Sequence, residues 1–101
     1  MTGGKPEGGD RSLLEVHLDS WLKEFGAPGR QTAAADTVDQ LLDELERRYP
    51  RLRFRIRDET GHLRKYVRVF VDGTDISGTT GTATSLREAR TVDILHSIAG
   101  G

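Results

Sequence analysis

The last two residues of the chain, Gly100 and Gly101, have the clearest chemical potential. Glycine has no Cβ and adopts φ angles of either sign, so a Gly-Gly segment can enter a channel too narrow for other residues. A free α-carboxylate, with a pKa of about 3.5, is ionised at neutral pH and is a poor electrophile until it is activated. We therefore expect the C-terminal carboxylate of Gly101 to be the reactive group, and Gly100, Ala99 and Ile98 to be bound by a partner.

Other residues offer weaker chemistry. The histidines His17, His62 and His96 lack the spacing of metal ligands, so we expect no metal site. His96 and Ser97 are neighbours, and neighbours in a strand point to opposite faces, which prevents them from forming a nucleophile–base pair. The chain has no cysteine and so offers no thiolate and no disulfide. Any sulfur that it handles must come from another molecule.

Charge is balanced overall but unevenly distributed. Fifteen Lys and Arg against sixteen Asp and Glu leave a net charge of −1, which argues against attraction of the whole protein to nucleic acid or to a membrane. Residues 36–46 contain five acids and no base, whereas residues 47–68 contain nine bases. Four of these bases alternate along the chain: Arg51, Arg53, Arg55 and Arg57. We interpret this arginine stripe as a solvated strand face or a docking patch, with nucleic acid as the less favoured ligand.

Length and composition indicate one small domain. A chain of 101 residues, of which 35% are hydrophobic, has room for a single thin core. Residues 1–11 are rich in glycine and charge and are expected to be a disordered leader, followed by a folded domain over 12–96 and a flexible tail over 97–101. The sequence shows no signal peptide and no segment as long as a membrane span, so a cytoplasmic protein is expected.

Hydrophobic periodicity predicts the element order β-β-α-β-β-β. The clearest element is a helix that Thr37 caps, with Gln40 as the reciprocal partner, and that Pro50 ends. Asp72-Gly73 predicts a tight hairpin turn, and Ser85 begins a possible single helical turn over 85–88. Strands are expected around 14–18, 30–34, 51–57, 66–71 and 92–95, and the hairpin turn leads from 66–71 into the short segment 74–76.

Three stretches of this pattern carry a family resemblance: the helix over 37–50, the strand and turn over 69–76, and the ending over 92–101. In this order, over residues 13–101, the chain resembles the ubiquitin-like β-grasp sulfur carriers. That family includes the small subunit of molybdopterin synthase and the carriers of thiazole and cysteine synthesis. The stretch 63–66 makes the chain most similar to the longer, cysteine-synthesis type.

The resemblance implies an α+β, ubiquitin-like β-grasp fold, with a mixed sheet of four to five strands packed on one main helix. It also implies a protein cosubstrate and not an enzyme. An E1-like adenylating enzyme would use ATP and Mg²⁺ to activate Gly101, and a sulfurtransferase or other sulfur donor would convert it to a thiocarboxylate. A sulfur-accepting biosynthetic enzyme would then use that sulfur for cysteine, a cofactor or a specialised metabolite. No cofactor is expected on the chain itself, and neither nucleic acid nor membrane is an expected partner.

Outside the tail, four apolar residues could form an exposed partner patch: Phe70, Ile76, Leu86 and Ile94. Most of them are expected to join the core instead, and Phe70 is the one retained as a candidate for partner binding. The chain departs from the family pattern in having residues 88–91 where a Gly-Asp turn is usual before the last strand, and His96-Ser97 where proline is usual just before the tail. Two other functions stay open: a ubiquitin-like modifier conjugated to lysines, and the small subunit of molybdopterin synthase.

Overall fold

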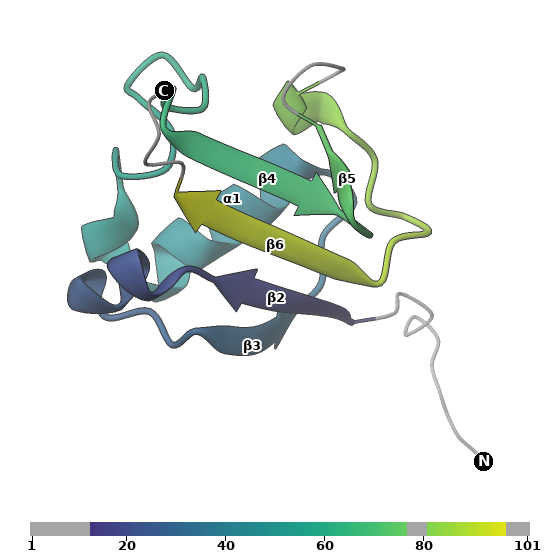
Figure 1. Ribbon diagram of the computed structural model, residues 1–101, viewed down its shortest axis with the longest axis horizontal. Helices are drawn as coiled ribbons and strands as arrows, with labels where there is room; N and C mark the ends of the chain where they lie inside the picture. The colour runs from purple at the N-terminus through teal and green to yellow at the C-terminus, as the bar shows by residue number, and fades with distance from the viewer. Residues whose placement is uncertain (1–12, 77–80, 97–101) are drawn as a thin grey trace.

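The computed structural model describes residues 13–76 and 81–96, which form a mixed sheet packed on one main helix (Figure 1). The strands are β2 (Leu14–Leu18), β3 (Arg30–Ala33), β4 (Val67–Val71), β5 (Thr74–Asp75) and β6 (Thr91–His96), and the helix is α1 (Val38–Arg48). The strand order is β3-β2-β6-β4-β5, with β2 and β6 parallel and the other neighbours antiparallel. The predicted α+β fold class is confirmed.

Helix α1 begins and ends as the sequence predicts. The Thr37 hydroxyl accepts a hydrogen bond of 3.2 Å from the backbone N–H of Gln40, which satisfies one of the free donors of the first turn. The Gln40 side chain accepts a bond of 2.9 Å from the N–H of Asp36, one residue before the cap. At the other end Tyr49 leaves the helical region with φ −129°, because Pro50 follows it.

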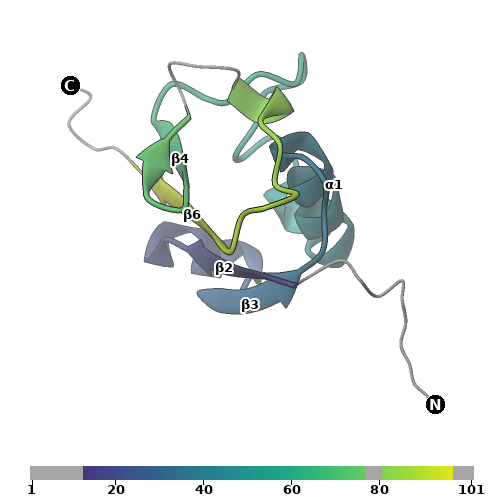
Figure 2. The same ribbon diagram turned by 90° about the vertical axis from the view of Figure 1, so that its right-hand side faces the viewer.

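The core lies between α1 and one face of the sheet (Figure 2). Alternate strand residues are buried because successive side chains point to opposite faces. The buried residues of α1 are Val38, Leu41, Leu42 and Leu45, and they face Leu14, Val16, Leu18, Val67, Val69, Val92 and Ile94 of the strands. The opposite face of the sheet carries the polar alternates and is not covered by α1.

The prediction of a strand over 51–57 is wrong. Pro50–Leu52 is instead a 3-10 helix, η2, and Phe54 has a positive φ of +65°. Leu52 and Ile56 are fully buried, but Phe54 between them is 48% exposed, so the three apolar residues do not share a face. The alternation predicts a strand from local pattern alone. The tertiary structure overrides it, because Pro50 starts a tight turn and Arg57 is drawn to the acidic side of α1.

The predicted hairpin turn is present. Asp72 and Gly73 have φ angles of +50° and +87° and connect β4 to β5, as expected of a two-residue loop with positive φ at both positions. The Asp72 carboxylate also accepts hydrogen bonds of 2.9 Å from the backbone N–H groups of Arg90 and Thr91. This hairpin therefore holds residues 90 and 91 before β6, in the segment where the sulfur carriers that the chain resembles usually have a Gly-Asp turn.

The predicted helical turn over 85–88 is wrong. Ser85 forms an isolated antiparallel bridge with Thr37, which keeps the backbone extended at that point, and only Arg87 and Glu88 form a turn. A 3-10 helix, η3 (Gly81–Ala83), lies just before it. Pairing with the start of α1 decides the conformation here.

Two predicted segments, the leader over 1–11 and the tail over 97–101, lie outside the described residues. Of the helices formed by residues 13–76 and 81–96, none combines the length and the apolar character that a membrane span needs.

Candidate functional site

The end of β6 is where the predicted reactive tail leaves the sheet. His96 is the last residue of β6 and the last described residue before the tail. The predicted site residues Ile98, Ala99, Gly100 and Gly101 all lie outside the described residues. The structure therefore shows the base from which the tail starts.

Asp19 holds this base through hydrogen bonds from two directions. Its carboxylate Oδ2 accepts a bond of 2.9 Å from the backbone N–H of His96, and its own N–H donates a bond of 3.0 Å to the carbonyl of Ile94. The contact arises because β2 and β6 are parallel, so that their C-terminal ends meet at the same edge of the sheet. Asp19, immediately after β2, thus reaches the last residue of β6.

Two aromatic side chains enclose the His96 ring. The ring of Trp21, in the 3-10 helix η1 (Ser20–Phe25), lies 4.9 Å from it between centroids, and the ring of Tyr66, just before β4, lies 5.3 Å away. Trp21 and Tyr66 contact each other edge to face at 5.7 Å. His96 is thus packed among rings, and the base of the tail is held without the proline that is usual in the family.

Sequence reasoning did not identify Asp19, Trp21 or Tyr66 as parts of this site. They are far from His96 along the chain, and no spacing pattern connects them. The sequence predicts a mixed sheet but not which strands are neighbours. In the structure β2 and β6 are parallel neighbours, so the polar residue directly after β2 lies near the end of β6.

The uncovered sheet face carries a row of polar side chains, and the apolar Phe70 lies beside it. His17 Nδ1 lies 2.7 Å from Asp93 Oδ1, and Asp93 is in turn the register partner of Phe70. Phe70 is half-buried, and its other register partner is Asp75. Its partner-binding role stays a prediction. The residues expected in the core, Ile76, Leu86 and Ile94, are all buried, which confirms that assignment.

The edge of this face is charged. The Arg30 Nε donates a bond of 2.7 Å to Glu15 Oε2, and this contact lowers the pKa of the Glu15 carboxyl below its ordinary value. Arg30 is the register partner of His17, so the ion pair extends the polar row across β3 and β2. The uncovered face therefore offers a partner mainly charged and hydrogen-bonding groups.

The arginine stripe does not form one face. Arg57 is only 12% exposed in its side chain and contacts three acids of α1; the contacts are with Asp39 at 3.1 Å, Asp43 at 2.8 Å and Glu46 at 3.1 Å. Burial acts to lower the pKa of Arg57, but its bonds to Asp43 and Glu46 outweigh burial and raise it. Arg51 donates to the carbonyl of Glu24 at 2.7 Å, while Arg53 and Arg55 are exposed.

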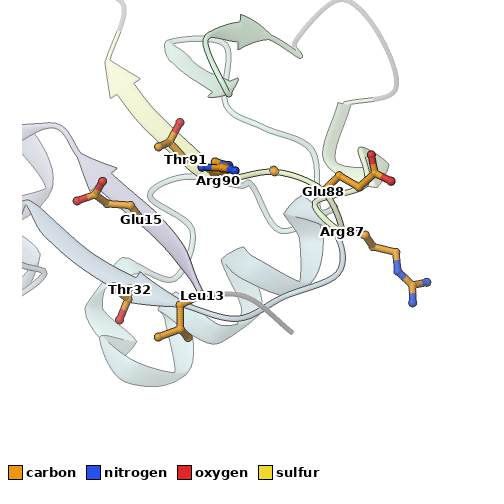
Figure 3. A pocket seen from close by; sticks show the side chains of 8 residues that line it. Leu13, Glu15, Thr32, Arg87, Glu88, Arg90 and Thr91 are labelled. Atoms are coloured by element: carbon orange, nitrogen blue, oxygen red, sulfur yellow. The ribbon is translucent and has the colours of Figure 1, made fainter. Parts of the chain in front are cut away.

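A groove of about 650 Å³ lies at the opposite end of the sheet from His96 (Figure 3). Its lining comprises Leu13, Glu15, Thr32, Arg87, Glu88, Ala89, Arg90 and Thr91. The side chains of Arg87 and Glu88 point in different directions and do not converge on one ligand position. Within the part of the chain that the structure describes, no three His, Asp or Glu side chains are grouped to hold a metal ion. The groove is not the candidate site.

The chain is similar to known proteins. The model of the ThiS family matches residues 23–101. The sulfur carrier protein CysO of Mycobacterium tuberculosis H37Rv is 31% identical over 72 residues, which are 69% of this chain and 77% of the relative.

Solved structures agree as well. A chain of the BexX/CysO complex of Amycolatopsis orientalis has a TM-score of 0.76 at 25% identity, over 87% of this chain and 99% of that one. The small archaeal modifier protein 1 of Haloferax volcanii has a TM-score of 0.71 at 20% identity, over 89% of this chain and 100% of that one, a likeness of fold alone. These likenesses confirm the predicted ubiquitin-like β-grasp fold.

Proposed function

Because this chain belongs to the ThiS family, whose model matches residues 23–101, we propose that it is a sulfur carrier that works through the carboxylate of Gly101. It acts as a protein cosubstrate and not as a catalyst. The observation that carries the proposal is that the family match runs through the C-terminal Gly-Gly. The 31% identity with a sulfur carrier protein supports it.

The chemistry has two loading steps. An E1-like enzyme with ATP and Mg²⁺ would join the Gly101 carboxylate to the α-phosphate of ATP, releasing pyrophosphate and leaving an acyl-adenylate. A sulfide equivalent from a sulfur donor would then attack the carbonyl carbon and displace AMP, which leaves a thiocarboxylate. Activation is needed because the free carboxylate is a poor electrophile. The thiocarboxylate sulfur would finally attack the acceptor bound to a biosynthetic enzyme, in the synthesis of cysteine, a sulfur-containing cofactor or a specialised metabolite.

The geometry at the base of the tail supports this role. Asp19, Trp21 and Tyr66 hold His96, so the point from which the tail starts is fixed relative to the sheet. The five residues 97–101 can span at most about 17 Å when extended. That length is enough to reach into a partner's active site while the folded domain stays outside it. The lack of cysteine in the chain also fits a reducing compartment such as the cytoplasm.

The test is the intact mass of the protein after incubation with the E1-like enzyme of the same genome, ATP, Mg²⁺ and a sulfide donor. We expect one oxygen of the terminal carboxylate to be replaced by sulfur, and no change in a control that lacks Gly101. Unchanged wild-type mass would contradict the proposal. If peptides isolated from cells carry a Gly-Gly remnant on lysine, the result would instead support the function of a protein modifier.

A further inference from the structure

We propose that Phe54, with Arg53 and Arg55 on either side, forms a docking patch for an acidic surface of the protein that loads the tail. We call these three residues the Arg53–Arg55 patch. The inference rests on the proposed function and adds to it the charge of the partner's surface. It differs from the sequence interpretation of an arginine stripe, because it leaves out Arg51 and Arg57 and has an aromatic residue at its centre.

Phe54 is presented to solvent by an unusual backbone. Its φ of +65° is uncommon for a bulky residue, and its side chain is 48% exposed. The conformation is held from both sides: Arg64 Nε donates a bond of 2.7 Å to the Phe54 carbonyl, and the N–H of Arg55 donates a bond of 2.9 Å to the Leu52 carbonyl. A strained residue that adds little to the core and displays an aromatic ring is a candidate for contact with a partner.

The two arginines of the patch keep their charges available. The Arg53 guanidinium carbon lies 5.2 Å from the Phe54 ring centroid, and that of Arg55 lies 4.7 Å from the ring of Phe25. Among residues 13–76 and 81–96, neither Arg53 nor Arg55 forms an ion pair. The arginines that do form ion pairs are Arg30, Arg47, Arg48 and Arg57. Incoming carboxylates can therefore pair with Arg53 and with Arg55 without breaking an existing ion pair.

The patch lies at the same end of the molecule as the base of the tail. Figure 1 shows the loop between η2 and β4, the helix η1 and the arrowhead of β6 together at that end. The contacts agree with the view, because Arg55 lies over Phe25 of η1, and Trp21 of the same helix packs on His96. A partner that receives the tail at this end is in position to contact the patch.

The surroundings favour a protein over a nucleic acid. Asp39, Asp43 and Glu46 lie on the side of α1 that Arg57 contacts, and Arg57 follows the patch in the chain by two residues. A long polyanion lying across the patch would meet these carboxylates, whereas a small acidic protein surface can avoid them. A single exposed aromatic residue also lacks the row of rings on which successive bases stack.

The experiment measures steady-state loading by the E1-like enzyme as a function of carrier concentration. The variant is Arg53→Glu with Arg55→Glu, and the control is Arg87→Glu, an exposed arginine at the other end of the sheet. We expect the double variant to raise KM by about tenfold or more, with kcat unchanged, and added salt to raise the KM of the wild type more than that of the variant. The control should behave as the wild type does.

A second variant removes the aromatic ring of Phe54 but keeps the positive φ of its backbone. Phe54→Asn is suited to positive φ, since asparagine tolerates that region better than most residues. We expect it to raise KM, while Leu13→Asn, at a 63% exposed residue remote from the tail, should not. Circular dichroism and urea unfolding of each variant separate docking from loss of fold.

Three results would overturn the inference. If the wild type is loaded and the Arg53 and Arg55 variant has the same KM as the wild type, the docking patch alone is overturned. Wild type that is not loaded at all would overturn the proposed function and the patch with it. Binding of a fluorescent single-stranded oligonucleotide that depends on Arg53 and Arg55 would assign the patch to nucleic acid instead.

Discussion

Asp19 Oδ2 accepts a hydrogen bond of 2.9 Å from the backbone N–H of His96, which joins the residue after β2 to the last residue of β6. β2 and β6 are parallel neighbours in the sheet, so this hydrogen bond connects their C-terminal ends. A shift of this end would change the direction in which residues 97–101 leave the domain. Asp19 is therefore a positioning residue in the proposed function.

Asp19→Ala should reduce kcat/KM for loading by the E1-like enzyme by about tenfold, because a misplaced tail reaches the adenylation site less often in the productive geometry. Asp19→Asn keeps an acceptor oxygen and should retain most of the activity. Urea unfolding should show a loss of about 1 kcal/mol for the alanine variant, as for one hydrogen bond. Equal kcat/KM in the two variants would show that the bond does not position the tail.

Gly100→Val should abolish adenylation while leaving the fold intact. The substitution adds a branched Cβ where the proposed function requires a slender backbone in a partner's channel. ATP–pyrophosphate exchange with the E1-like enzyme measures the step directly, and circular dichroism checks the fold. Exchange at the wild-type rate would remove the need for glycine at that position.

Ile56→Ala should destabilise the protein by about 3 kcal/mol, because a fully buried side chain is truncated and leaves a cavity. Phe54→Ala should cost less than about 1 kcal/mol, because that side chain is largely exposed. A strand over 51–57 would place both residues on one face and make their costs similar. The free energies of unfolding in urea therefore distinguish the observed loop from the strand that the sequence predicts.

Asp72 should make the free energy of unfolding depend on pH in the acid range. The backbone N–H groups of Thr91 and Arg90 lower the pKa of its carboxyl in the folded state, so the unfolded chain binds the proton more readily. The stability that Asp72 contributes is fully present above its pKa in the unfolded chain, which is about 3.9. It is lost as the pH falls through the lower pKa that Asp72 has in the folded protein.

Asp72→Asn keeps an acceptor and tolerates the positive φ, but it does not titrate. Urea unfolding between about pH 7 and about pH 2.5 should show a smaller fall in stability for the variant than for the wild type. Parallel curves for the two proteins would show that Asp72 does not contribute to the pH dependence.

Elements with strong local signals were predicted correctly. Thr37 and Pro50 bound the helix, because a side-chain cap and a proline act on the backbone within one turn. Asp72-Gly73 forms the expected hairpin, because those two residues accept positive φ at low cost. The reactive role of Gly101 also comes from the sequence, and it stays a prediction because residues 97–101 lie outside the described part of the chain.

The tertiary structure decided what depends on contacts between distant residues. The alternation over 51–57 has the period of a strand, but the ion pairs of Arg57 with α1 and the turn at Pro50 impose a different path. The surroundings of His96 depend on Trp21 and Tyr66, which meet only after the sheet has formed. A local pattern reports the preference of a few neighbouring residues, whereas these arrangements depend on side chains that folding brings together from separate elements.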